Sequence, residues 1–165
     1  MSDKSPEQAK EKLWSMMKGI TYAMLTTEDA GTLRARPMVA AQDSFDGTLW
    51  FFTRESSHKV QEVDTEQHVG VTYADPNAQN YVSLSGRATL VRDKAAIQAR
   101  WAEPMRTWFP KGTEDPEAAL LKVEVDAAEY WDAPSSSMVQ AYGYLKARLT
   151  GETPDPGENK KLSFR

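Results

Sequence analysis

The chain contains no cysteine and only two histidines among its 165 residues. Without cysteine, the protein cannot form disulfides, thiolate zinc sites, iron–sulfur clusters or thiol nucleophiles. His58 and His68 alone argue against a histidine-rich metal centre, and we predict no metal site.

Long apolar runs and an excess of charge of one sign are also missing. No segment approaches the length of a membrane span, and the charged N-terminal region lacks the apolar core of a signal peptide, so we expect no membrane association and a cytoplasmic protein. The net charge is −4, with acidic and basic residues mixed along the chain. We therefore expect no nucleic-acid partner, and any anion site must be local.

The length and a hydrophobic content of 40% fit one globular domain, which we place at residues 1–150. Residues 151–165 are polar and contain two prolines and two glycines, which predicts an extended or mobile tail. No internal repeat is found.

Strand-forming segments separated by turn signals dominate the chain, and they are expected at residues 21–27, 32–41, 48–53, 68–74, 81–91 and 120–131. Helices are expected after Ser5, after Ser56 or Ser57, from Asp93 to about residue 101, and from Met138 to about residue 149. Gly86 interrupts the fifth strand and predicts a bulge or bend. The pattern predicts a mainly β protein, a six-stranded antiparallel barrel with helical insertions.

A combination of cations and hydroxyls lies between Arg36 and Lys59. Thr53 ends a predicted strand, Ser57 lies at the start of the next helix, and Lys59 is in its first turn. With Arg36 from the preceding hairpin, these side chains could converge on a phosphate. A capped helix with a solvated lysine explains the same residues, so the pattern alone does not decide between the two.

Five short motifs along the chain resemble those of the FMN-binding split barrel, the pyridoxamine-phosphate-oxidase-like superfamily, and within it the general stress protein group. The likeness covers about residues 13–145. In order, the motifs are Arg36-Pro37-Met38-Val39, Phe52-Thr53, Ser57-His58-Lys59, Tyr81 with the strand that follows it to Gly86, and Glu129-Tyr130-Trp131-Asp132.

The resemblance implies a homodimer that binds FMN without a covalent bond at two interface sites. The FMN phosphate would be held by Arg36, Thr53, Ser57 and Lys59, whereas His58 either contacts the phosphate or faces solvent. The residues that would line the flavin ring and its ribityl chain are Pro37, Met38, Val39, Phe52, Tyr81 and Trp131. Trp131 could equally be a core anchor. Trp108 either covers the cofactor from the partner subunit or plugs the end of the barrel.

The chain also departs from the family. Pyridoxamine phosphate oxidases carry an Arg-x-His and a further Arg after the tryptophan, and here that spacing falls on Ser137-Met138-Val139 and Ala141. We therefore expect an FMN-binding flavoprotein, an oxidoreductase of this type that lacks vitamin B6 oxidase activity. We assign no catalytic residue, electron donor or acceptor. The alternatives are a flavin carrier or stress sensor without turnover, and a split barrel that binds a deazaflavin or heme, although the scarcity of histidine disfavours heme.

Overall fold

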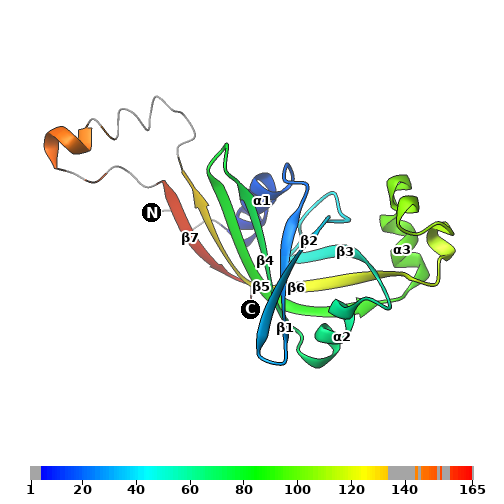
Figure 1. The fold of residues 1–165 in the computed structure, drawn as a ribbon. Coiled ribbons are helices and arrows are strands. Elements are labelled where there is room, and N and C mark those ends of the chain that lie inside the picture. The colour runs from blue at the N-terminus through cyan, green and yellow to red at the C-terminus, as the bar shows by residue number, and fades with distance from the viewer. Residues whose placement is uncertain (1–4, 134–143, 145, 152, 154–156, 165) are drawn as a thin grey trace.

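A curled antiparallel sheet forms the body of the computed structural model, which describes residues 5–133, 144, 146–151, 153 and 157–164 (Figure 1). The strands pair in the order β2-β1-β4-β5-β6-β3, and β7 pairs with β6. Their bounds are β1 Ala23–Asp29, β2 Thr32–Met38, β3 Thr48–Arg54, β4 His68–Asp75, β5 Asn80–Val91, β6 Ala118–Asp132 and β7 Glu158–Ser163. The six predicted strands and the mainly β class are confirmed.

The sheet curls into a half-barrel with a seam between β2 and β3. In the part of the chain that the structure describes, a single bridge between Ala40 and Phe51 joins the two sides of this seam. The barrel is therefore split there, and backbone groups near the end of β2 remain outside a continuous ladder.

The long strand β6 bends, and Gly86 makes the bend possible. The first half of β6, residues 118–124, pairs with β3. Its second half, residues 127–132, pairs with β7. The register between β5 and β6 shifts at Ser85 and Gly86. A Cβ atom on Gly86 would lie 2.1 Å from the carbonyl oxygen of Glu124. The predicted bulge is confirmed, because only glycine allows this close backbone approach.

Helices cover the two ends of the curled sheet (Figure 1). Helix α1, Pro6–Met17, begins with a capping box between Ser5 and Gln8, and its Met16 and Met17 are buried in the core. Helix α2, His58–Thr65, buries Val60 and Val63. Helix α3, Lys94–Arg100, begins at Asp93 as predicted. The segment between α3 and β6 contains two short 3-10 helices, Glu103–Thr107 and Gly112–Glu114.

The C-terminal region differs in part from its prediction. Residues assigned to a polar tail form β7, whose Leu162 packs against the core. Partly buried and exposed residues alternate along this short, lysine-rich segment, as is typical of a strand at the edge of a sheet. Of the helix expected from Met138, the structure describes only residues 144 and 146–150, which are helical. Ser137, Met138, Val139 and Ala141 lie outside the described residues. None of the described helices is long and apolar enough to cross a membrane.

Replacing Gly86 by alanine is expected to destabilise the protein by about 2 to 3 kcal/mol, because the new methyl group meets the backbone of β6. Gly19→Ala is the matched control, since a Cβ atom there has no neighbour within 4 Å. Urea denaturation followed by tryptophan fluorescence measures both. Equal stability of the two variants would contradict the role given to Gly86.

Candidate functional site

Polar side chains are buried at the end of the half-barrel that α2 covers. Thr27 from β1, Thr53 from β3 and Glu62 from α2 are the buried polar residues among those described. The register of β1 and β2 sets Thr27 opposite Arg34, and Leu25 opposite Arg36. Because paired residues share a face of the sheet, both arginines lie on the face of β2 that continues the buried face of β1.

Glu62 and Thr27 hold the guanidinium group of Arg36. Arg36 Nη1 donates to Thr27 Oγ1 at 2.6 Å, and Nη2 donates to Glu62 Oε2 at 2.7 Å. The Thr27 hydroxyl donates to the same carboxylate oxygen, which closes a ring of hydrogen bonds. Arg34 Nη1 donates to Glu62 Oε1 at 3.0 Å. A buried carboxylate therefore has the cationic and hydrogen-bonding partners that make its burial tolerable.

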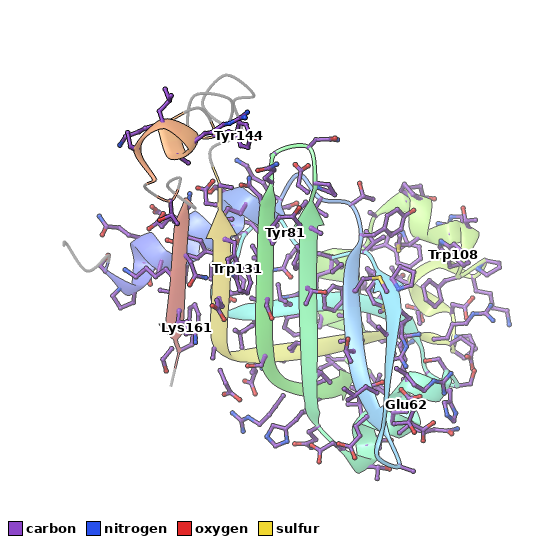
Figure 2. All side chains as sticks on the ribbon, turned by 60° about the vertical axis from the view of Figure 1, so that its left-hand side comes forward. Glu62, Tyr81, Trp108, Trp131, Tyr144 and Lys161 are labelled. Atoms are coloured by element: carbon purple, nitrogen blue, oxygen red, sulfur yellow. The ribbon has the colours of Figure 1, made fainter. Side chains whose placement is uncertain are left out.

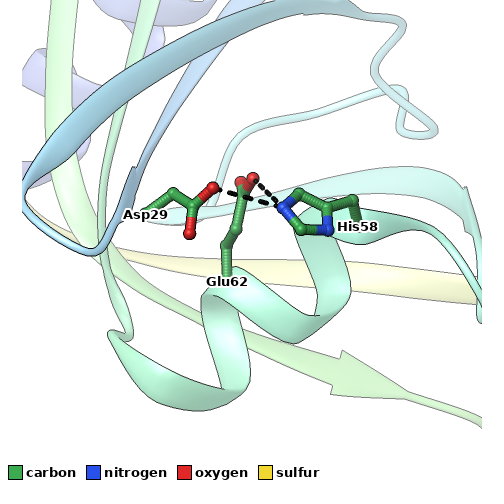
Figure 3. A group of neighbouring side chains, drawn as sticks. All are labelled: Asp29, His58 and Glu62. Carbon is green, nitrogen blue, oxygen red and sulfur yellow. Dashed lines mark hydrogen bonds and ion pairs between the residues drawn. The ribbon is translucent and has the colours of Figure 1, made fainter.

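His58 and Asp29 extend this network toward solvent (Figure 3). His58 Nε2 lies 3.2 Å from Asp29 Oδ2 and 3.5 Å from Glu62 Oε1. These three residues also form the one grouping of potential metal ligands within the described part of the chain. Arg34 donates to carboxylate oxygens of both acids, so the ligand atoms are already engaged and a guanidinium opposes a second cation. The grouping suits an ion-pair network better than a metal.

The environment shifts three pKa values at this end of the barrel. Burial raises the pKa of Glu62, but the hydrogen bond from Thr27 and the charges of Arg36 and Arg34 outweigh it, and the pKa lies below its usual range. The hydrogen bond with His58 is the main cause that lowers the pKa of Asp29. Desolvation and the nearby charge of Arg36 lower the pKa of Lys59, against a smaller opposing effect of Glu62.

The Lys59 ammonium group makes no direct ion pair with the residues that the structure describes. Its side chain is half-buried and close enough to Arg36 for repulsion to be felt, yet no hydrogen bond or ion pair to its ammonium group is found among the described residues. Nearby, the hydroxyls of Thr53 and Ser57 lie 3.2 Å apart. Ser57 is the N-cap residue of α2, but its side chain makes no capping bond. The structure thus brings together two cations, two hydroxyls and a helix N-terminus.

Arg36 keeps unused hydrogen-bonding capacity. A guanidinium group carries five N–H donors, and two of them bond to Thr27 and Glu62. These two contacts leave the other N–H groups available. The guanidinium group of Arg36 can therefore be fixed by Thr27 and Glu62 and still donate hydrogen bonds to a ligand.

The residues predicted to line a flavin ring fall into separate places. Met38 is buried and Val39 is exposed at the seam. Phe52 faces away from the core side of β3 and packs against Trp101 and Phe109, with ring centroids 5.8 and 6.1 Å apart.

Two further aromatic residues of the predicted site share the outer face of the sheet. Tyr81 on β5 is directly opposite Trp131 on β6, and each side chain is 40% exposed. Figure 2 shows this pair on neighbouring strands, with Glu62 toward the opposite end of the sheet and Trp108 beside the region of α3. Trp108 is 65% exposed. Within one chain, the residues predicted to hold a phosphate therefore lie apart from these aromatic residues. Pro37, also predicted to line the flavin, is on β2 opposite Met24 of β1.

The sequence reasoning missed Thr27, Arg34 and Glu62. One signal was present: Arg34 and Arg36 alternate on one strand, so both face the same side. Two cations on the inward face of a barrel require a buried acid, and Glu62 is one turn after His58 in the next helix.

A curled antiparallel half-barrel with a cation-lined end defines a split-barrel protein of the flavin-binding type of fold. The model of the family described as pyridoxamine 5'-phosphate oxidase like matches residues 8–155, and the chain belongs to this family.

Individual relatives agree with this family. The crystal structure of a protein assigned as general stress protein 26 from Jannaschia sp. CCS1 superposes with a TM-score of 0.78 at 26% identity, over 96% of this chain and 99% of that one. The general stress FMN/FAD binding protein from Xanthomonas citri gives a TM-score of 0.70 at 27% identity, over 79% and 92% of the two chains. Protein bli-3 from Neurospora crassa is 23% identical over 95% of this chain and 80% of its own length.

Replacing Glu62 by glutamine is expected to lower the free energy of unfolding at pH 7 by about 1 to 3 kcal/mol, because charged hydrogen bonds to Arg34, Arg36 and Thr27 are weakened. The folded-state pKa of Glu62 lies below the ordinary value of 4.5. Its contribution is therefore complete above pH 4.5 and lost as the pH falls through the lower folded value.

The stability difference between wild type and Glu62→Gln should accordingly shrink in acid, as measured by urea denaturation at several pH values. Asp64→Asn on the exposed side of α2 serves as the control. A Glu62→Gln variant as stable as this control at pH 7 would refute the role of the carboxylate.

Proposed function

We propose that this protein is an FMN-binding flavoprotein whose α2 end holds the cofactor's phosphate. The observation that carries the proposal is the half-buried Lys59 ammonium group beside Arg36, without an anionic partner among the described residues. Two neighbouring cations that are partly removed from water are unfavourable unless an anion lies between or beside them. Glu62 pairs with Arg36 and offsets part of the charge at Lys59, and a phosphate would supply a direct anionic partner for the Lys59 ammonium group.

The remaining groups fit the same ligand. Thr53 and Ser57 offer hydroxyls 3.2 Å apart, and the N-terminus of α2 adds backbone N–H groups and a favourable dipole. Arg36 is held by Thr27 and Glu62 and retains donors for a further acceptor. His58 is committed to Asp29 and Glu62 in this arrangement, so its place in the site is that of a neighbour of the ion pairs.

The flavin ring would lie along Met38 and Val39, which continue the strand that carries Arg36. FMN is favoured over a non-phosphorylated flavin because the cation pair needs the phosphate. When bound, the isoalloxazine supplies hydride or electron transfer, and the protein contributes binding and orientation. Reduction of bound flavin by NADH or NADPH would favour an oxidoreductase over a carrier.

A homodimer would complete the site. Tyr81 and Trp131 form an exposed aromatic pair on the outer face of the sheet, and Tyr22 and Met24 on β1 and its approach are exposed as well. Exposed aromatic residues at this density are typical of association surfaces. A second copy that covers this face would bring Tyr81, Trp131 and Trp108 of one chain toward the flavin held by the other chain. Within a single chain, these three residues lie away from the proposed phosphate site.

Replacing Lys59 by alanine is expected to weaken FMN binding by about 1 to 3 kcal/mol, because a charge-assisted phosphate contact is lost. Riboflavin has no phosphate, so its affinity should stay unchanged. Flavin fluorescence titration measures both ligands, and Lys10→Ala, which removes a surface ion pair with Glu7, is the matched control. Unchanged FMN affinity in Lys59→Ala would show that this lysine is a solvated charge and not a phosphate contact.

Replacing Trp131 by glutamate should convert the dimer into a monomer, because a charge would be buried against the partner. Sedimentation velocity of the variant and of wild type measures the change. Leu33→Glu, at an apolar residue that is 73% exposed, is the control. A monomeric wild type, or a variant that remains dimeric, would contradict the proposed interface.

A further inference from the structure

An open cleft of about 570 Å³ lies between the segment after β2 and the C-terminal end of α3. Residues 40–44 and Asp46 form one wall, and residues 99–102 form the other. Trp50 of β3 contacts both walls, because its backbone N–H donates to Gln42 and its ring lies against Arg100. The volume is within the range of roughly 300 to 1,000 Å³ that is typical of small-molecule sites.

This cleft is on the face of β3 opposite to the proposed phosphate site. Trp50 and Thr53 are an odd number of positions apart on the strand, so their side chains project to opposite faces. Thr53 is buried beside Ser57, whereas Trp50 is partly exposed in the cleft. Binding in the cleft therefore involves a different set of residues and does not rest on the proposed function.

Arg100 supplies a cation to the helical wall of the cleft. Its guanidinium carbon lies 3.8 Å from the centroid of the Trp50 ring, which fixes the group against the indole. Of its five N–H donors, one on Nη1 donates to the carbonyl oxygen of Ala96 at 3.4 Å, and no ion pair of Arg100 is found among the described residues. The guanidinium group is therefore held in place and retains donors for a carboxylate.

Two carboxylates belong to the opposite wall. Asp46 Oδ1 accepts from the backbone N–H of Thr48 at 2.9 Å. Asp43 is exposed and makes no hydrogen bond or ion pair with the residues that the structure describes. Gln42, which precedes Asp43, is tied to β3 by its hydrogen bond with the backbone N–H of Trp50 at 2.8 Å. This wall therefore presents negative charge from a segment that is anchored to the sheet.

Acidic and basic groups thus line one cleft without forming an ion pair with each other in the part of the chain that the structure describes. We propose that the cleft binds a small zwitterion, with its ammonium group at Asp43 and Asp46 and its carboxylate at Arg100. A ligand with one charge would meet a charge of its own sign in the lining, whereas a zwitterion meets an opposite charge at each end. The indoles of Trp50 and Trp101 favour a flat body between the two charges, as in an aromatic amino acid or a short peptide.

Three benzene derivatives of similar shape are the probes for this site. The zwitterion 4-(aminomethyl)benzoate carries both charges, 4-methylbenzylamine carries only the ammonium group, and 4-ethylbenzoate carries only the carboxylate. Calorimetric titration of the full-length protein at neutral pH should show the zwitterion binding about tenfold more tightly than either singly charged probe, because only the zwitterion pairs with both walls.

Variants of each wall separate the two contacts. Asp43→Asn combined with Asp46→Asn should weaken binding of the zwitterion and of 4-methylbenzylamine about tenfold without weakening 4-ethylbenzoate. Arg100→Gln should weaken the zwitterion and 4-ethylbenzoate and spare the amine. The doubly changed variant should fold normally, since Asp43 has no described partner and an asparagine oxygen can still accept from Thr48. Lys94→Gln, exposed on the same helix and outside the lining, is the matched control and should change none of the affinities.

Failure of the zwitterion to bind wild type, or a zwitterion no tighter than both singly charged probes, would overturn the proposal. Undiminished affinity for the zwitterion in the doubly changed acid variant would overturn it as well, and this result is available even if Arg100→Gln does not fold. Lys59→Ala should bind the zwitterion as wild type does, because it alters only the phosphate end. Titrations of the protein as purified and with added FMN therefore keep the outcome for this cleft separate from that for the cofactor site.

Discussion

The buried Glu62 carboxylate is the interaction on which the rest of the candidate site depends. It accepts hydrogen bonds from Arg34, Arg36 and Thr27, and in doing so it ties α2 to the β1–β2 hairpin. Without this acid, two arginines and Lys59 would share one end of the barrel with too little negative charge. The carboxylate neutralises part of that charge and fixes the guanidinium of Arg36, while Lys59 remains available for an external anion.

The split at the β2–β3 seam gives the site its second constraint. Arg36 and Thr53 are on the inner face of the sheet, beside Ser57 and Lys59 of α2, whereas the exposed aromatic pair Tyr81 and Trp131 is on the outer face. A cofactor with a charged end and a flat ring needs both kinds of surface. In the proposed homodimer, association of two chains would reconcile these placements, because the outer face of one copy would meet the seam of the other.

Much of the fold could be predicted from the sequence because its signals are local. Alternation marked six strands, Ser5 and Gln8 marked the start of α1, and Gly86 marked the bend between β5 and β6. The edge strand β7 was missed, because this short, polar, lysine-rich segment has little strand propensity of its own. Its strand conformation depends on pairing with β6.

The site was less predictable, because its decisive contacts join distant segments. Thr27 and Glu62 are 35 residues apart, and neither is unusual in its own segment. The Phe52 ring, which was predicted to line the flavin, packs with Trp101 and Phe109 in an aromatic cluster that joins β3 to the region of α3. The face of the sheet to which a strand residue points was predictable, but the side chain from another segment that contacts it there was not.

The visible absorption spectrum of the purified protein tests the central claim most directly. The account predicts a yellow protein with a flavin spectrum, and release of FMN, identified by chromatography, upon denaturation. A colourless protein that also fails to take up added FMN would contradict the claim that the Arg36 and Lys59 end of the half-barrel is a flavin phosphate site.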